Sequence, residues 1–373
     1  MHAKRDNPAI PAWKGDELDS PYPPEIEPAY FDEDLKAWVL SRHADVLAAF
    51  RASSLCPASS KSTKPPDLTQ ESLRVKLRER TMDALSPTQL RTWREELVPE
   101  ARQLVDALPA GVPIDLVDQC ARPFCLVLAA IVTGTSRSDA EALYETAQPL
   151  SAAAAEPYDR ALRDRAREAD AKLQGCFHSE YETLRGPGFV ALAHTMQGIL
   201  ANAWFALIQH PQDWALVYRQ PELMEQAIEE LLRYAGLPRI LSRAATEDID
   251  LNGTFIRKGE RIILRIIAAN HDPERFPDAN QLNVARGGGG HVALGAGPHS
   301  CVAANLIRMA TVAITQPLIS RFAEAVPERA IEWHGGSAFR SPKSLWVSLT
   351  EGNGRSLERI HAEAAGSGSV TIP

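Results

Sequence analysis

The stretch that decides the fold of this chain runs from residue 291 to residue 308 and reads His291-Val-Ala-Leu-Gly295-Ala-Gly297-Pro-His299-Ser-Cys301-Val-Ala-Ala-Asn305-Leu-Ile-Arg308. It joins a glycine-rich loop to an expected helix, and Cys301 stands at the junction. The first backbone N–H groups of a helix have no partner within the helix, and the helix dipole is positive at that end, so both favour a thiolate. Cys301 is therefore a candidate metal ligand or nucleophile. The residues alone also allow a small buried cysteine of the core.

Three other functions of glycine-rich loops and cysteines fit this stretch poorly. The chain has no GxxxxGK[ST] sequence, and Gly295-x-Gly297 lacks the third glycine of a dinucleotide-binding loop. A zinc site would need partner ligands that the neighbouring sequence does not supply.

Composition indicates a soluble globular protein. Of the 373 residues, 45% are hydrophobic and 24% are charged, and 40 Lys and Arg against 48 Asp and Glu give a net charge of −8. This acidic balance argues against nucleic-acid binding, which usually needs a basic face. The five cysteines are an odd number without a CxxC pair, which argues against a disulfide framework as the basis of the fold. Without a signal-like start or a run of about 20 apolar residues, we expect a cytoplasmic protein that does not enter a membrane.

The sequence predicts a mainly α single domain over 1–373, with a small β-sheet region. Residues 1–30 form an irregular, proline-rich lead-in, and 354–373 form a flexible tail. Loop residues are concentrated at 53–66. Helices are expected at 44–50, 69–84, 87–107, 113–133, 137–153, 157–184, 188–209, 211–218, 221–235 and 302–325. Strands are expected at 37–40, 239–244, 249–251, 254–256 and 261–267, with Asn252-Gly253 as a hairpin turn.

The cysteine loop resembles that of the cytochrome P-450 family of heme-thiolate monooxygenases, written FGxGxHxCxGxxLAR. Both glycines, the histidine, the cysteine, the leucine and the arginine match in register, whereas Leu294, Ala303 and Ile307 replace a phenylalanine, a glycine and an alanine. The resemblance implies a cytochrome P-450 fold around one heme b. It also implies that Cys301 ligates the iron, that Leu294 packs against the heme, and that His299 binds a propionate.

A second motif lies upstream in the order that the family shows. Glu230 and Arg233 have the ExxR spacing, which places both on one helix face. Such a pair is, by itself, more often an exposed surface pair. The resemblance adds Arg286 and implies a buried structural network of the three side chains.

Further arginines match positions that contact heme propionates in the family. Arg243 follows the ExxR helix, and Arg74 and Arg78 fall on an HxxxR motif with arginine in place of the histidine. Exposed arginines on a basic helix are the alternative for the last two.

The largest departure from the family is in the helix over the distal heme face. The family's AGx[D/E]T falls on Ala191-Leu192-Ala193-His194-Thr195, so Thr195 is kept while Leu192 replaces the glycine and His194 replaces the acid. His194 can relay protons in place of the carboxylate, line the pocket or contact substrate, or ligate the iron from the distal side. The resemblance places Thr195 and His194 at the catalytic centre.

The implied reaction inserts one oxygen atom from O2 into a small or medium organic substrate that the sequence does not identify. The implied pocket residues are Ala191, Leu192, Leu237 and Ile240, with Arg239 and Arg340 as candidate anion anchors. Three alternatives stay open: a peroxygenase, a non-oxygenating heme enzyme, and a heme-binding protein without catalysis. Ferredoxin and ferredoxin reductase are the expected electron donors, docking on a basic segment of Arg74, Lys76, Arg78, Arg80 and Arg308.

Overall fold

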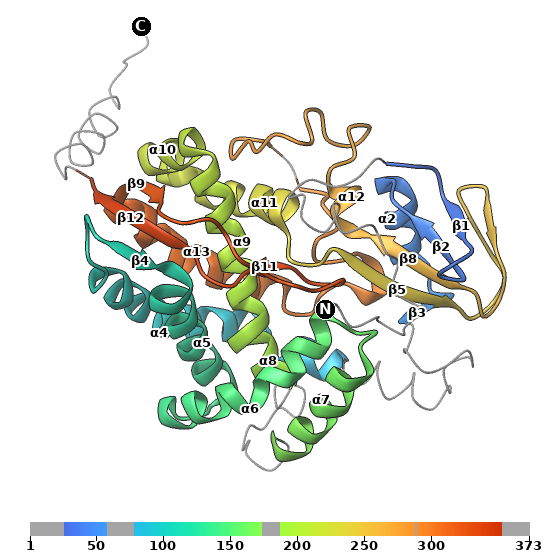
Figure 1. The fold of residues 1–373 in the computed structure, drawn as a ribbon, viewed down its shortest axis with the longest axis horizontal. Coiled ribbons are helices and arrows are strands. Elements are labelled where there is room, and N and C mark those ends of the chain that lie inside the picture. The colour runs from blue at the N-terminus through green and yellow to red at the C-terminus, as the bar shows by residue number, and fades with distance from the viewer. Residues whose placement is uncertain (1–25, 58–77, 174–186, 288, 353–373) are drawn as a thin grey trace, which may run out of the picture.

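A computed structural model describes residues 26–57, 78–173, 187–287 and 289–352. The expected tail 354–373, most of the lead-in, Arg74 and Lys76 lie outside this part of the chain. The α-helices are α2 (His43–Arg51), α4 (Pro87–Asp106), α5 (Arg122–Thr133), α6 (Arg137–Ala155), α7 (Arg160–Leu173), α8 (Pro187–Val190), α9 (Met196–Gln209), α10 (Pro211–Arg219), α11 (Met224–Ala235), α12 (Ile266–Asn270) and α13 (Ala304–Arg321). Most of them gather on one side of the molecule, and α9 crosses its centre (Figure 1).

Several helix ends have clear local causes. The hydroxyl oxygen of Ser86 accepts the N–H of Gln89 at 3.4 Å at the start of α4, and Ser136 caps α6 in the same way at 3.1 Å. Helix α5 ends at Gly134, whose φ of 67° is in the left-handed region. These signals explain why sequence patterns locate the helices well.

The central helix α9 continues from α8 through a π-helical turn, η3 (Ala191–Thr195). By length and composition, Gly188–Gln209 could cross a membrane, but 72% of its most apolar window is buried inside the protein. Helices α10 and α11 pack on α9, as do strands of two small sheets. The buried indole of Trp204 donates a hydrogen bond to Thr315 on α13 at 3.1 Å. Helix α9 is therefore the core helix of this fold.

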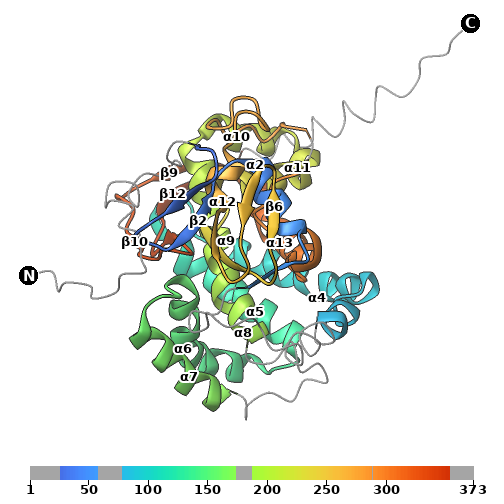
Figure 2. The ribbon, with the colours of Figure 1, turned by 90° about the vertical axis from the view of Figure 1, so that its right-hand side faces the viewer.

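The main sheet has five strands in the order β1-β2-β8-β5-β3, and it faces the viewer in Figure 2. These strands are β1 (Tyr30–Asp32), β2 (Ala37–Leu40), β8 (Arg261–Arg265), β5 (Ile240–Ala245) and β3 (Leu55–Pro57), and only β2 and β8 are parallel. A three-stranded sheet contains β4 (Pro113–Asp115), β12 (Trp346–Glu351) and β9 (Phe322–Pro327). Two hairpins are formed by β6 (Ile249–Leu251) with β7 (Thr254–Ile256) and by β10 (Trp333–His334) with β11 (Ser341–Pro342). Asn252 and Gly253 make the first hairpin turn with positive φ, as the sequence predicts.

The fold class is confirmed as mainly α with small sheets, and four local predictions are wrong. The expected helix 113–133 begins as strand β4 and a π-helical turn at 117–121, and the expected helix 302–325 stops at Arg321 before strand β9. The expected strand 261–267 gives way to helix α12 at residue 266, and part of the expected loop 53–66 is strand β3. Three of these errors concern strands whose partners are distant in sequence, so local patterns do not reveal them.

Candidate functional site

The cysteine loop is a tight turn that leads into α13. The N–H of Cys301 donates to the carbonyl of Leu294 at 2.7 Å, and residues 297–299 form a 3₁₀ turn. Gly297 has a φ of +64°, and a Cβ there would lie 2.9 Å from the carbonyl oxygen of Phe50 on α2. The loop therefore needs glycine both for its backbone conformation and for its contact with α2. The structure describes the backbone but not the side chain of His299.

The Cys301 thiol is free and only partly exposed. Burial raises the pKa of the Cys301 thiol. The N–H of Ala303 and the charges of Arg78 and Arg308 act in the opposite direction, because they favour the thiolate. Arg78 reaches this loop directly, because its guanidinium donates to the carbonyl of Ser300 at 2.8 Å and to the Ser300 hydroxyl at 3.1 Å. A thiolate would be stable at this place if a further positive charge lay at the sulfur.

Arg308 is tied to Glu229, the residue before the ExxR glutamate. Its Nε and Nη2 both donate to the Glu229 carboxylate, the second at 3.1 Å, and His291 Nε2 lies 3.3 Å from the same group. Burial alone would raise the Glu229 pKa, but the His291 and Arg308 partners lower it to about 2. Much of the Arg308 charge is therefore neutralised inside the protein. The sequence analysis did not identify Glu229 as a site residue, although its position directly before Glu230 could have pointed to it.

Glu230, Arg233 and Arg286 form the expected network. Arg233 donates its Nε to Glu230 Oε2 at 2.7 Å and its Nη2 to Oε1 at 2.8 Å, and Arg286 Nε donates to Oε1 at 3.0 Å. Both Glu230 and Arg233 are almost fully buried. Arg233 also donates to the carbonyls of Asn270 and Ala279, at 2.7 and 2.8 Å. The network thus braces the segment 270–286, which leads into the cysteine loop.

Arg243 lies on β5 with its guanidinium 5.5 Å from the centre of the Phe50 ring. It is only 6% exposed, and its Nε has no hydrogen-bond acceptor. Its Nη1 donates to the carbonyl of Ser242, and burial lowers its pKa. A buried cation with an unused donor is a place where an anionic group would fit.

The distal residues lie in the π-helical turn η3. His194 Nε2 lies 3.0 Å from the carbonyl oxygen of Tyr144 on α6, and the two rings stack with centroids 4.0 Å apart. Burial lowers the His194 pKa, so the ring is neutral at pH 7 and its Nε2–H donates to that carbonyl. The Tyr144 hydroxyl donates to Gln197 at 2.7 Å. Tyr144, which no sequence signal singled out, therefore fastens α6 to the distal turn.

His194 and Thr195 both line a cavity of about 230 Å³, here called the distal cavity. Its other lining residues come from α6 and Glu156 after it, from α7 and α9, from the segment after α11, which includes Leu237, and from residues 334–342. Leu192 is buried in the core, Ala191 is exposed, and Ile240 lines a separate cavity. The structure therefore brings only Leu237, of the four predicted pocket residues, to the cavity of His194 and Thr195.

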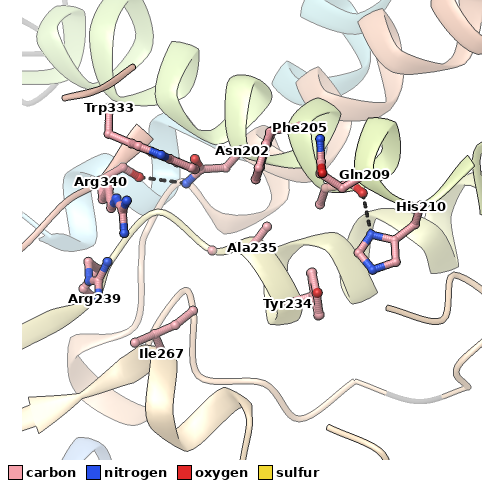
Figure 3. Close-up of a pocket in the computed structure, with 12 residues that line it drawn as sticks. Asn202, Phe205, Gln209, His210, Tyr234, Ala235, Arg239, Ile267, Trp333 and Arg340 are labelled. Atoms are coloured by element: carbon pink, nitrogen blue, oxygen red, sulfur yellow. Dashed lines mark hydrogen bonds between the residues drawn. The ribbon is translucent and has the colours of Figure 1, made fainter. Parts of the chain in front are cut away.

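Arg239 and Arg340 lie in a third cavity of about 210 Å³ near the C-terminal end of α9. Figure 3 shows the two guanidinium groups side by side, with Trp333 above Arg340 and with Tyr234 at the opposite end. The amide of Asn202 donates to the Arg340 carbonyl at 2.9 Å. Neither arginine lines the distal cavity, so the predicted anion anchors are not brought to His194 and Thr195.

Comparison with known proteins gives one family throughout. The family model of cytochrome P450 matches residues 218–334. Nocardicin C N-oxygenase of Nocardia uniformis subsp. tsuyamanensis is 29% identical over 83% of this chain and 89% of its own. Biflaviolin synthase CYP158A1 of Streptomyces coelicolor is 29% identical over 67% of this chain and 70% of its own. Ligand-free CYP164A2 of Mycobacterium smegmatis has the same fold, with a TM-score of 0.75, 22% identity, and coverage of 84% of this chain and 91% of that one.

A mainly α body with a cysteine loop at the start of a long helix and a buried ExxR network beside it is the arrangement that the resemblance to heme-thiolate proteins implies. The chain is similar to cytochrome P450 proteins, through the family model over residues 218–334 and through relatives and solved structures over most of its length. Its relatives include the N-oxygenase named above and a mycinamicin VIII C21 methyl hydroxylase of Micromonospora griseorubida, which is 29% identical over 66% of this chain and 68% of its own.

The residues present fit the heme that this family implies. In the described part of the chain, no three His, Cys, Asp or Glu side chains form a metal site of their own. A metal at Cys301 therefore needs further ligands from outside the protein, such as the nitrogens of a porphyrin. The unused donor of Arg243 fits a carboxylate such as a propionate, and the lone cysteine fits a single axial thiolate.

Proposed function

We propose that this protein is a heme b monooxygenase that uses O2 and in which Cys301 is the axial ligand. The observation that carries this proposal is the position of the Cys301 sulfur, held at the start of α13 by the bond from its N–H to Leu294. When bound, heme supplies an iron whose thiolate ligand favours cleavage of the O–O bond. The chain's own task on this side is to hold the sulfur as a thiolate and to fix the loop.

The residues around the loop divide this task. The N–H of Ala303 and the charges of Arg78 and Arg308 favour the thiolate, and the network of Glu230, Arg233 and Arg286 keeps the approaching segment in place. We assign Arg243 to one heme propionate because its buried Nε has no other acceptor. By resemblance, Arg74, Arg78 and His299 are further candidates for the propionates, and Leu294 for packing against the ring.

On the distal side, we propose that Thr195 and His194 would hold and release the protons that the reaction consumes. The Nε2–H of His194 is used by the Tyr144 carbonyl, so Nδ1 is the ring atom at which a proton can be accepted and released. The same bond makes iron ligation through Nε2 unfavourable, since it would have to break. Leu237 lies in the same cavity and is a candidate for substrate contact, and Ala191, Leu192 and Ile240 are further candidates by resemblance.

The absorption spectrum tests the ligand. Purified protein should contain heme, and its ferrous-CO complex should show the red-shifted band of a thiolate complex. Cys301→Ser should lose this band and keep its helical circular dichroism. Cys56→Ser is the matched control, because this buried thiol donates to the Ala244 carbonyl, as a serine hydroxyl also can. An unchanged band in Cys301→Ser would exclude the proposed ligand.

A peroxygenase is the second candidate, and a specific observation favours it. Leu192 is buried at the position of the family's glycine, and His194 replaces its acid, so the usual path for protons to bound O2 is altered. Product formed with NADH, ferredoxin and ferredoxin reductase should exceed product formed with hydrogen peroxide if the enzyme is a monooxygenase. The reverse ratio would identify a peroxygenase, and no product in either assay would favour a heme protein without this chemistry.

We propose that a separate ferredoxin donates the electrons, and that the protein is a single domain of the cytoplasm. Arg78 and Arg80 lie on the segment before α4, and Arg78 contacts the cysteine loop at Ser300. The charge of Arg308 is neutralised by Glu229. Electrostatic docking predicts that reduction by an acidic ferredoxin slows as salt rises. Stopped-flow reduction over a salt series measures this rate, and a rate independent of salt would contradict docking at these arginines.

A further inference from the structure

A cavity of about 390 Å³ lies between the α6–α7 junction and strands β5 and β8. We call it the arginine cavity, because Arg163 from α7, Arg243 from β5 and Arg261 from β8 all line it. Tyr158 and Ser242 line it too, and their hydroxyl groups are hydrogen-bonded to each other. Phe339 lines both the arginine cavity and the distal cavity, so the two cavities adjoin at this side chain.

Arg163 and Arg261 lack an acidic partner within the described part of the chain. Arg163 donates its Nη1 to the carbonyl of Pro157 at 2.7 Å, whereas its Nε is buried and has no acceptor. Arg261 has its guanidinium 5.8 Å from the centre of the Tyr158 ring and makes no ion pair. No Asp or Glu lines the cavity. Together with Arg243, three arginines thus share a partly enclosed space in which no described side chain supplies a negative charge.

Another cavity of the protein contains arginines that do have acidic partners. A cavity between α4, α5 and α6 is lined by Arg122 and Arg137, and it also contains the acids Asp118 and Glu141. There Arg122 pairs with Asp118 at 3.3 Å, and Arg137 pairs with Glu100. The whole chain has a net charge of −8, so the positive charge of the arginine cavity runs against the overall charge of the protein. Its positive charge is a local feature of this site.

Arg243 does not account for this charge. It pairs with Ile262 in the register of β5 and β8, whereas Arg261 lies opposite Ala244, so Arg243 and Arg261 point to opposite faces of the sheet. The Arg243 guanidinium lies over Phe50, although Arg243 also lines the arginine cavity. One anionic group bound to Arg243 would still leave Arg163 and Arg261 without an acidic partner.

We propose that the substrate of this enzyme is an amphipathic carboxylic acid, whose carboxylate binds Arg163 and Arg261 while its apolar body extends past Phe339 into the distal cavity. Guanidinium groups bind planar carboxylates with two parallel hydrogen bonds. The Tyr158 and Ser242 hydroxyls add donors, and the rest of the arginine cavity is lined largely by alanine, proline, isoleucine and leucine side chains. This assignment names the substrate class of the proposed monooxygenase and rests on that function.

Matched pairs of ligands test the charge requirement. Decanoate and decanamide, and biphenyl-4-carboxylate and its amide, are titrated into the holoenzyme by calorimetry, which does not depend on turnover. We expect at least one acid to bind about tenfold more tightly than its amide, equivalent to about 1.4 kcal/mol. Arg163→Gln and Arg261→Gln should each weaken the acid and leave the amide unchanged, and the double variant should abolish the preference. Arg163→Lys should keep part of it.

Arg137→Gln is the control, because this arginine lines a cavity in which acids neutralise it, and it should bind both ligands as the parent does. Equal affinities for acid and amide in both pairs, or no binding by either acid, would overturn the proposal. Tighter binding of decyl phosphate than of decanoate would overturn the assignment to a carboxylate.

The same ligands distinguish a failure of the anion site from a failure of the proposed monooxygenase activity. Acids that bind through the arginines but give neither a Soret shift nor an oxygenated product would leave the anion site standing and contradict the proposed function. Amides that are oxygenated as well as the acids, with equal affinity, would support the function and contradict the anion site.

Discussion

At the scale of single residues, Glu230 has the largest structural effect in the site. Its carboxylate accepts from Arg233, from Arg286 and from the N–H of Asn283. Glu230→Ala would leave the Arg233 guanidinium buried at 2% exposure without its counter-charge. Breaking a buried pair in this way typically costs about 3–5 kcal/mol.

We therefore expect Glu230→Ala to lower the free energy of unfolding by about this amount and to reduce the heme content of the purified protein. Urea unfolding and the ratio of heme to protein absorbance measure the two effects. Glu351→Ala is the control, because it removes a pair with Arg321 whose side chains are 54% and 25% exposed, and it should cost less than about 1 kcal/mol. Equal losses in the two variants would contradict a bracing role for Glu230.

The second prediction at this scale concerns His194. If its Nδ1 relays protons, His194→Ala should keep the substrate-induced Soret shift, divert NADH electrons to peroxide and lower the coupled product. Since burial lowers the His194 pKa, any loss of coupling in the parent on acidification should begin below pH 6.5, where the ring gains its proton. Coupling measured from pH 5 to 8 in both proteins tests this, and equal coupling throughout would eliminate the relay.

At the scale of elements, Gly297 is required for two reasons, a positive φ and a close contact with the backbone of α2. Gly297→Ala meets both a φ of +64° and the backbone of α2, whereas Gly134→Ala meets a similar φ of +67° with nothing within 4 Å. The left-handed conformation costs roughly 1–2 kcal/mol in either variant. Thermal unfolding should therefore show a larger loss for Gly297→Ala, together with a weaker heme band. Equal losses would mean that the contact of the loop with α2 is unimportant.

The sequence predicted elements well where the cause is local. The caps at Ser86 and Ser136, the Asn252-Gly253 turn and the cysteine loop all depend on residues close together in the chain. Strands β3, β4 and β9 were missed because each is defined by a partner far away in sequence. The partners in the network of Glu230 followed from the family motif. The stacking of His194 on Tyr144 did not, since it depends on how α6 crosses the distal turn.

At the scale of the whole molecule, buried neutral histidines set the response to acid. Burial lowers the pKa of His271 to about 4, and it also lowers those of His43, His194 and His334. The unfolded chain, with histidine pKa values near 6.5, binds these protons more readily, so stability is complete above about pH 6.5 and falls as the pH drops toward 4. His271 alone should account for about 2 kcal/mol between pH 7 and pH 5.

Urea unfolding at pH 7 and pH 5 measures this loss. His271→Gln should reduce it, because the amide can still donate to the Ile267 carbonyl, as Nδ1 does, but does not titrate. Glu229, with a pKa of about 2, contributes only below about pH 4.5 and does not disturb this interval. The same pH dependence in parent and variant would show that His271 is not responsible.

The apolar segment Gly188–Gln209 leaves the ribosome well before the parts that cover it. Helices α10 and α11 and strands β9 and β11, which all pack on α9, are encoded downstream, and β12 ends at Glu351. At roughly 5–20 residues per second, the interval from residue 209 to residue 351 is on the order of ten seconds. During that interval the segment presents chaperones and membrane-insertion factors with a helix that satisfies their length and hydrophobicity requirements. Slower translation after residue 209 would therefore lengthen the time for which this apolar segment stays uncovered.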